Sequence, residues 1–277
     1  MPQDADPTPR PPTRPCTRPY TRYASLQGKL VFISGGSSGI GAELVRAFAA
    51  QGARVAFCGT RPEGGQALAA ELQAAGLPAP WYAACDVRDT AAYQALLARL
   101  MAEQGAVQVL VNNAGRDDRH RMEDVTPALW DDRLALNLKH YFFAIQAVAP
   151  GMAAAGGGVV VNMGSVSWLR GRPHLVGYTT AKAGILGLTR TLARELGGRN
   201  IRVNAVVPGA IVTERQNALH RDAAADQAFL DAQCLKVRLD PGHVARATLF
   251  LASDDADGMT GQHVLVDAGI AQQSVIT

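Results

Sequence analysis

The sequence predicts an α/β protein built on a parallel sheet. Seven short apolar runs recur along the chain, longer stretches with helical spacing separate them, and a glycine-rich turn follows the first run. The apolar runs are nearly continuous rather than alternating in polarity, which is typical of strands buried on both faces. Strands that alternate with helices indicate a doubly wound architecture. We therefore expect a single Rossmann-type domain with a seven-stranded parallel sheet and helices on both faces.

The expected strands are short runs in which valine, isoleucine, phenylalanine and other apolar residues dominate. Such residues fit a pleated surface that is buried on both sides. In chain order, the strands are expected at Lys29–Ser34, Arg54–Cys58, Trp81–Cys85, Val107–Val111, Val159–Met163, Arg202–Val207 and His263–Val266.

The expected helices are longer segments rich in alanine, leucine and glutamate, with apolar residues three or four positions apart. Gly52 directly follows the first of them and marks its end. The helices are expected at Ala42–Gln51, Gly65–Ala75, Thr90–Gln104, Trp130–Met152, Thr179–Leu196 and Val244–Leu251. Because no linker interrupts this alternation, we expect residues 24–277 to form one domain.

Residues 1–23 differ in composition from the rest of the chain. They hold seven prolines and four arginines and few apolar residues. Such a stretch buries too little apolar surface to offset the conformational entropy lost on ordering, so we expect a disordered or polyproline tail. An organelle transit peptide is the alternative because it would also be arginine-rich and poor in acidic residues. The prolines oppose the amphipathic helix that a transit peptide needs.

The composition excludes several classes of partner. Lys and Arg number 27 against 24 Asp and Glu, a balance too even for a dedicated nucleic-acid binder. No apolar run reaches the ~18 residues of a membrane span, and no secretory signal precedes the domain. The six histidines lack metal-ligand spacing, so no metal is expected. The scattered cysteines predict reduced thiols in a cytoplasmic protein; they are Cys16, Cys58, Cys85 and Cys234.

The glycine-rich turn Ser34–Gly41 follows the first strand and opens the first helix. Its glycines leave the backbone free to turn sharply and to approach a pyrophosphate, and the helix N-terminus attracts negative charge. An ordinary glycine-rich turn is the alternative, but the strand before it and the helix after it favour a dinucleotide site. The expected contacts are Gly35, Ser37, Ser38, Gly39, Ile40 and Gly41.

The end of the second strand favours NADP, with NAD still possible. An NAD site usually places an acidic side chain there for the ribose 2′-hydroxyl. This chain has Gly59, Thr60 and Arg61, so no carboxylate repels a 2′-phosphate and Arg61 could pair with it. A solvated turn charge is the alternative for Arg61. Further cofactor contacts are expected after the third and fourth strands, from Asp86, Val87, Asn113, Ala114 and Gly115.

Tyr178 and Lys182 carry the strongest chemical signal. Four residues apart, they share one helix face, and an ammonium beside a phenol favours the phenolate. Such a tyrosine can exchange a proton with an alcohol or a carbonyl. Ser165, at the end of the preceding strand, can polarise the same oxygen. Asn137 lies within a leucine-rich helix, where a catalytic amide and a satisfied core amide are both open.

These motifs, together with Asn112–Gly115 and Pro208-Gly209, resemble the short-chain dehydrogenase/reductase family over residues 26 to 270. Ser34 stands where that family usually has threonine, and the hydroxyl is kept. The resemblance implies a dinucleotide-binding catalytic domain in which Tyr178 is the acid/base, Ser165 steadies the substrate oxygen, and Lys182 holds the nicotinamide ribose. It implies that Asn137 anchors a proton-relay water. It also implies nicotinamide contacts from Pro208, Gly209, Ile211 and Thr213, and a homo-oligomer, tetramer or dimer, built on the long helices.

Further segments are similar to aldose 1-dehydrogenases, including bacterial D-xylose 1-dehydrogenases. They lie around Asp117, in Gly164–Trp168 and in Gln233–Arg238. This likeness implies oxidation of the C1 hydroxyl of a cyclic sugar to the lactone, with D-xylose, L-arabinose, L-fucose and D-galactose all open. The xylose enzymes carry an acidic residue where this chain has Gly59. The substrate contacts expected are Asp117, Arg119, His120, Ser167 and Trp168.

Residues 213–240 have intermittent helical spacing and no glycine, so we expect a helical lid over the site. Two other functions stay open. One is a 3-oxoacyl or general carbonyl reductase on the same scaffold, which would prefer an apolar pocket. The other is a non-enzymatic redox sensor that binds NADP and could dispense with the pair of Tyr178 and Lys182.

Overall fold

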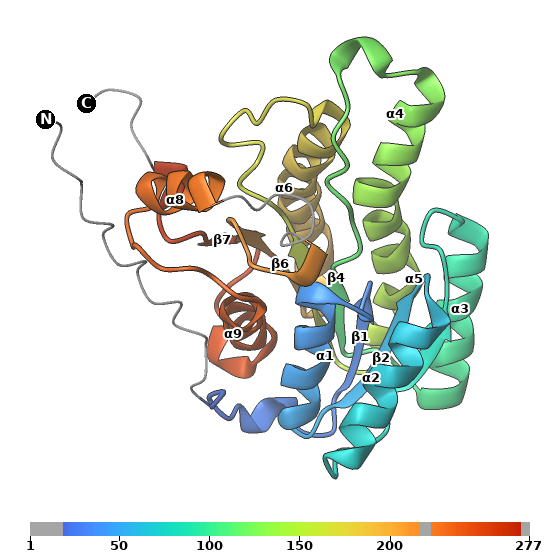
Figure 1. Ribbon diagram of the computed structural model, residues 1–277. Helices are drawn as coiled ribbons and strands as arrows, with labels where there is room; N and C mark the ends of the chain where they lie inside the picture. Colours follow the sequence, from blue (N-terminus) through green and yellow to red (C-terminus); the bar gives the residue numbers. More distant parts are fainter. Residues whose placement is uncertain (1–18, 216–222, 273–277) are drawn as a thin grey trace, which may run out of the picture.

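The computed structural model describes residues 19–215 and 223–272, which form one seven-stranded parallel sheet with helices on both faces (Figure 1). The sheet order is β3-β2-β1-β4-β5-β6-β7, and neighbouring strands pair in parallel. The expected fold is therefore confirmed. The strands are β1 (Leu30–Ser34), β2 (Arg54–Gly59), β3 (Trp81–Ala84), β4 (Val109–Asn112), β5 (Gly158–Met163), β6 (Ile201–Pro208) and β7 (His263–Val266).

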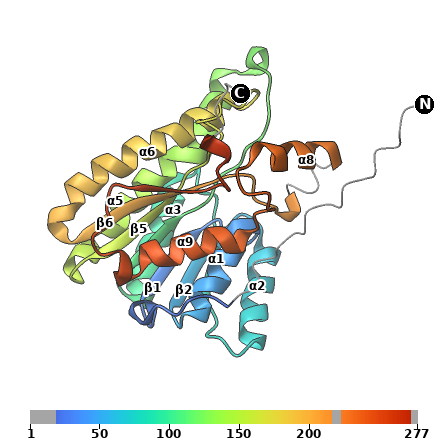
Figure 2. The same ribbon diagram turned by 90° about the vertical axis from the view of Figure 1, so that its left-hand side faces the viewer.

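Two apolar cores lie on opposite faces of the sheet. Along β1, Val31 and Ile33 belong to one core, and Leu30 and Phe32 to the other, because successive side chains of a strand point to opposite faces. Figure 2 shows the two helical layers. The first core is covered by α1 (Gly39–Ala50), α2 (Pro62–Ala74) and α9 (Pro241–Ala252), and the second by α3 (Thr90–Gln104), α5 (His140–Ala154) and α6 (Val176–Leu196).

Among the described residues, two more α-helices are α4 (Pro127–Leu134) and α8 (Ala223–Ala232), and α8 falls within the stretch for which the sequence predicts a helical lid. The described part of the chain also has single turns of 3₁₀ helix: Ala24–Leu26, Met122–Asp124, Gly197–Arg199, Asp254–Ala256 and Ile270–Gln272. Leu26 and Ala256, in two of these turns, belong to the first core.

The expected single helix Trp130–Met152 has a different structure. α4 and α5 are joined by one turn of π-helix, Ala135–Lys139, with Asn137 at its centre. Hydrophobic spacing cannot reveal such a turn, because the helix continues on both sides of it. π-turns often occur at functional sites. Four other helices, α1, α2, α6 and α9, begin three residues before the sequence predicts, and α2 and α9 start with proline at the first position.

Residues 19–23 correct the expected boundary of the N-terminal tail. They lie against the domain: the backbone of Tyr23 donates to the Gln51 side chain at 2.8 Å, and Gln51 donates to the carbonyl of Thr21 at 3.1 Å. The guanidinium of Arg246 lies 4.9 Å from the ring centre of Tyr20. The domain therefore starts at or before residue 19. The predicted disorder of residues 1–18 lies outside the described residues.

The sheet has its topological switch point between β1 and β4. From β1 the chain winds outward through β2 to β3, and from β4 it winds the other way to β7. Doubly wound proteins bind their ligands in the crevice at such a point, beyond the carboxyl ends of the strands. None of the helices within the described part of the chain combines the length and the apolarity that crossing a membrane requires.

A buried chain of polar side chains joins the middle strands to α6. Asn112 donates to the side-chain oxygen of Asn162 at 3.0 Å, and Asn162 donates to the hydroxyl of Thr189 at 3.0 Å. All three residues are at most 1% exposed. Such a network stabilises a fold only while each member keeps its partner, because a buried amide without one is costly.

We expect Thr189→Val to lower the free energy of unfolding by about 1–3 kcal/mol, because the Asn162 amide loses its acceptor in the core. Urea denaturation of both proteins measures the difference. Thr191→Val is the matched control, since Thr191 is exposed on the same helix. Equal stability of the two variants would contradict the importance of the network.

Candidate active site

A cavity of about 1180 Å³ opens at the carboxyl ends of the strands. It exceeds the ~300–1,000 Å³ of ordinary small-molecule pockets, so it has room for a dinucleotide together with a substrate. Every residue that the sequence predicts to contact the cofactor lines it, namely Gly35, Ser37, Ser38, Gly39, Ile40, Gly41, Gly59, Thr60, Arg61, Asp86, Val87, Asn113, Ala114, Gly115, Tyr178, Lys182, Pro208, Gly209, Ile211 and Thr213.

The glycine-rich turn is shaped by close backbone approaches. Gly35 has a φ of 68°, and a Cβ atom there would lie 2.9 Å from the Cα atom of Ala114. A Cβ atom at Gly41 would lie 1.9 Å from the carbonyl oxygen of Gly35. Only glycine fits both positions, and the turn delivers the N-terminus of α1 to the cavity. The geometry suits a pyrophosphate.

Ser34 and Asn113 tie this turn to the end of β4. The Ser34 hydroxyl accepts from the backbone N–H groups of Asn113 and Ala114 at 3.0 and 3.2 Å. The Asn113 side chain donates to the carbonyls of Ser34 and Gly35, both at 3.0 Å. Serine therefore supplies the hydroxyl contacts at this position, and the crevice between β1 and β4 is held rigidly.

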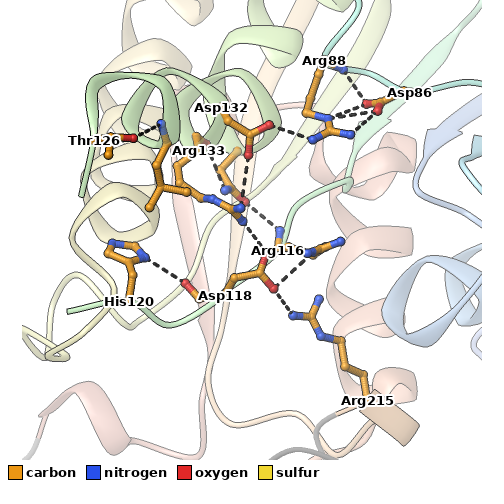
Figure 3. A network of polar contacts seen from close by, with 11 residues as sticks. Asp86, Arg88, Arg116, Asp118, His120, Thr126, Asp132, Arg133 and Arg215 are labelled. Carbon is orange, nitrogen blue, oxygen red and sulfur yellow. Dashed lines mark hydrogen bonds and ion pairs between the residues drawn. The ribbon is translucent and has the colours of Figure 1, made fainter. Parts of the chain in front are cut away.

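Asp86 lines the cavity, and its carboxylate is already engaged. Its carboxylate accepts from the backbone and from the guanidinium of Arg88, and Arg88 also pairs with Asp132 of α4 at 2.7 Å (Figure 3). These bonds hold the pKa of Asp86 below its usual value. An adenine amine would meet a carboxylate that is fixed in place and shared with Arg88. Nearby, Thr60 and Arg61 are exposed at the cavity edge.

Lys182 is buried, and two acceptors fix its ammonium. The Nζ atom donates to the carbonyl of Met163 at 2.8 Å and to the hydroxyl of Tyr141 at 3.1 Å. Tyr141 in turn donates to the same Met163 carbonyl at 3.1 Å. An ammonium has three donors, so one remains for the cavity. Burial lowers the pKa of Lys182 to about 7. The sequence does not predict a role for Tyr141, because in its sequence context it resembles an ordinary core aromatic residue.

Tyr178 shares the cavity with Lys182 and Ser165. The ammonium of Lys182 lies 5.6 Å from the centre of the Tyr178 ring, on the same face of α6. Burial raises the pKa of Tyr178 to about 12, while a hydrogen bond with Ser165 acts in the lowering direction. The loss of hydration outweighs the lowering influences in this pocket, and the lowering of the Tyr178 pKa by Lys182 stays a prediction.

Asn137 does not line the cavity. It is completely buried in the π-turn, where its side-chain oxygen accepts from the backbone of Arg116 at 2.8 Å and its amide donates to the carbonyl of Arg133 at 3.0 Å. The side chain thus fixes the loop after β4 to the helix. A Cβ atom at Gly115 would lie 2.8 Å from that oxygen, so the loop needs glycine there. The structure places Ser165, Tyr178 and Lys182 together, with Asn137 behind them.

Comparison with known proteins agrees with this geometry. Residues 35–271 match a family model described as enoyl-(acyl carrier protein) reductase. The chain is 52% identical to a D-xylose 1-dehydrogenase of Caulobacter vibrioides, over 89% of this chain and 97% of the relative. It is 46% identical to a protein of Rhizobium meliloti named probable galactose dehydrogenase, over 90% and 97%.

The chain belongs to the short-chain dehydrogenase/reductase family. Its members are oxidoreductases, and this chain is one of them. A solved structure agrees: the gluconate 5-dehydrogenase of Burkholderia cenocepacia, in complex with NADP and tartrate, superposes with a TM-score of 0.84 at 30% identity, over 91% of this chain and 99% of that one.

The substrate end of this dehydrogenase only partly matches the sequence prediction. Asp117 and Ser167 line the cavity, whereas Arg119, His120 and Trp168 are not among its lining residues. The ring of His120 contacts the carbonyl of Asp118 at 3.2 Å instead. Side chains that the sequence reading missed also line this end, namely Arg170, Arg172, Arg215, Phe229, Gln233 and Arg238. The spacing of residues along the sequence could not identify these side chains, because they come together from separate parts of the chain.

Asp118 organises the loop beneath the substrate end. Three arginines pair with its carboxylate: Arg116 at 2.6 Å, Arg215 at 2.7 Å, and Arg133 of α4 in a very short contact (Figure 3). These partners lower the pKa of Asp118 to about 2 against the opposing effect of burial. Asp118 thus pairs with three protein donors, and Asp117, which also lines the cavity, lies 3.7 Å from Arg215.

Other expectations concern metals and the lid. Within the described residues, no group of three or more His, Cys, Asp or Glu side chains is placed to hold a metal ion. Of the segment 213–240, the residues on the cavity wall include Thr213, Arg215, Phe229 and Gln233. Residues 216–222 lie outside the described part, and closure of this segment as a lid stays a prediction.

Proposed function

We propose that this chain oxidises the C1 hydroxyl of an aldose to the lactone. The observation that carries the proposal is that Tyr178 lines one cavity together with the glycine-rich turn and with the polar residues Asp117 and Ser167. A polyol needs hydrogen-bond partners around its reacting carbon, and this end of the cavity offers them. The names of the two curated relatives, D-xylose 1-dehydrogenase and probable galactose dehydrogenase, support an aldose.

In the proposed reaction a bound nicotinamide supplies the hydride acceptor. Ser165 holds the C1 oxygen of the sugar, and the Tyr178 oxygen takes the hydroxyl proton as the C1–H hydride leaves. Lys182, fixed by Met163 and Tyr141, points its remaining N–H into the cavity, where a ribose hydroxyl would lie. Asn137 keeps the loop after β4 in place beneath this site. Positioned proton transfer of this kind contributes about 10²–10⁴ in rate.

A 3-oxoacyl or general carbonyl reductase is the second candidate, and the description of the matching family model favours acyl chemistry. An acyl chain would require an apolar wall. The substrate end instead carries Asp117, Arg172 and Arg215, with Phe229 as one aromatic surface. The charged lining therefore supports the sugar over the acyl thioester.

The oligomeric state also belongs to this proposal. Phe142 of α5 is 39% exposed and Val176 of α6 is 41% exposed. These apolar side chains lie on the helices that the family resemblance implies for assembly. We infer a homo-oligomer, tetramer or dimer, with these faces buried between copies.

The decisive experiment measures turnover of a panel of aldoses with NADP and with NAD, alongside acetoacetyl thioesters with NADPH. We expect aldose oxidation with lactone as the product. Tyr178→Phe should lower kcat by about 10²–10⁴-fold while the affinity for NADP is kept. Reduction of thioesters in the absence of any aldose oxidation would overturn the proposal, and an unchanged kcat in Tyr178→Phe would exclude Tyr178 as the acid/base. Binding of NADP without turnover of any substrate would indicate a nucleotide-binding protein of another kind.

We infer that NADP is preferred because Arg61 lies at the edge of the cavity where a 2′-phosphate would lie and no carboxylate replaces Gly59. Arg61→Gln should raise the Kd for NADP about tenfold and leave the Kd for NAD within twofold, since one charge-assisted contact is worth about 1.5–3 kcal/mol. Isothermal titration calorimetry measures both constants. Arg99→Gln controls for the change in net charge, because Arg99 occupies an exposed position on α3. Equal losses for the two nucleotides would exclude a 2′-phosphate contact.

A further inference from the structure

Three arginines from two loops lie in or beside the wall of the cavity at its substrate end. Arg119 follows β4, and Arg170 and Arg172 lie between β5 and α6. Burial lowers the pKa of Arg172, and the positive charges of Arg119 and Arg170 act in the same direction, so the three guanidinium groups lie near one another. Arg170 and Arg172 belong to the cavity wall. Mutual repulsion opposes such a cluster unless a negative charge meets it.

Arg172 occupies the innermost position of this cluster. It is half-buried, and its guanidinium lies 5.1 Å from the ring centre of Phe229 on α8. It lies close enough to Tyr178 and Asp117 for their charges to influence its pKa. The aromatic ring supports the flat face of the guanidinium and leaves its N–H edge free for a planar anion.

Protein carboxylates do not neutralise Arg170 or Arg172. Among the residues whose side chains the structure describes, neither forms an ion pair, and Asp117 acts on Arg172 only beyond ion-pair distance. The contrast with the neighbouring loop is direct, because Arg116, Arg133 and Arg215 all pair with Asp118. Burying a cation without a partner costs stability, so a function must account for it.

We propose that the preferred substrate is an aldose that carries an anionic group, a carboxylate or a phosphate, at the end remote from C1. The anion would pair with Arg172 and Arg170 while C1 faces Tyr178 and Ser165. This inference rests on the proposed aldose oxidation and narrows its substrate class. Guanidinium groups bind both carboxylates and phosphates through paired N–H···O contacts. Either a uronic acid or a sugar phosphate would therefore supply the anion.

The anionic group takes no part in the bond changes. The C1–H bond breaks, and its hydrogen leaves as hydride with two electrons to the nicotinamide, which is reduced. The hydroxyl proton passes to the Tyr178 oxygen, and the C1–O bond becomes the carbonyl of the lactone. Asp117 would accept from a ring hydroxyl, since a carboxylate next to the anion would otherwise repel it.

The test uses sugars of identical ring stereochemistry that differ only at C6. One set is D-galactose, D-galacturonate and D-galactose 6-phosphate, and a second is D-glucose, D-glucuronate and D-glucose 6-phosphate. We expect the full-length protein to show kcat/KM at least tenfold higher for one anionic member than for its neutral partner, mainly through KM. The advantage should shrink as salt is added, because exposed charge pairs are screened. The two anionic arms decide between carboxylate and phosphate.

The variant Arg172→Gln should lose most of this advantage, and Arg172→Lys should restore part of it. Arg199→Gln removes the same charge from an exposed position after α6 and should retain the full advantage. Calorimetric binding of D-galacturonate and D-galactose to the protein saturated with NADP provides a readout independent of turnover.

The outcomes separate the two proposals. Oxidation of neutral aldoses without any preference for the anionic members would overturn the anion site and leave aldose oxidation standing. Binding of anionic sugars that depends on Arg172, without turnover of any aldose, would keep the anion site and overturn C1 oxidation. An anionic preference that survives in Arg172→Gln would assign it to another part of the pocket and contradict this inference.

Discussion

The structure depends on the burial of two titratable side chains at the point where a parallel sheet changes winding direction. Lys182 and Tyr178 lie one helical turn apart on α6 and line the same cavity, in which Lys182 is buried and Tyr178 is half-buried. Burial alone would keep the phenol protonated and weaken the ammonium, with pKa values of about 12 and about 7. The chain offsets this cost with oriented hydrogen-bond partners: the Met163 carbonyl and the Tyr141 hydroxyl accept from Lys182, and the hydrogen bond with Ser165 acts to lower the pKa of Tyr178. A bound nicotinamide cation would add the positive charge that favours the phenolate.

Much of the fold could be predicted because strands buried on both faces leave a simple pattern. Val159–Met163 is nearly all apolar, and β5 covers it with one residue more. The glycine turn was predictable for a similar reason, since Gly41 and Gly35 approach each other too closely for any side chain. The π-turn at Asn137 could not be predicted, because one extra residue in a helical turn leaves the apolar spacing on either side unchanged. The start of the domain at or before residue 19 was also missed, because its contacts with Gln51 and Arg246 are distant in sequence.

The candidate site also contains residues that the sequence could predict and residues that it could not. Residues at strand ends and in the α6 motif could be placed from sequence, since the topology brings those ends together. The substrate pocket could not, because Arg172 meets Phe229 of α8, which lies more than fifty residues away in sequence. Trp168 is not among the cavity-lining residues although it neighbours Ser167. The pairing of Asp118 with three arginines shows the same limit, because the sequence does not reveal which of the adjacent carboxylates, Asp117 or Asp118, forms most of the ion pairs.

The central claim is that partial burial in the cavity keeps the Tyr178 phenol protonated until nucleotide binds. It is tested most directly by NMR titration of tyrosine labelled with ¹³C at the ring carbon that bears the hydroxyl. Tyr178→Phe assigns the signal among the six tyrosines. The account predicts no ionisation of Tyr178 below about pH 10.5 in the free protein, above the ordinary pKa of about 10, and a pKa lower by at least about one unit with NADP⁺ bound. An ordinary pKa that nucleotide leaves unchanged would contradict it.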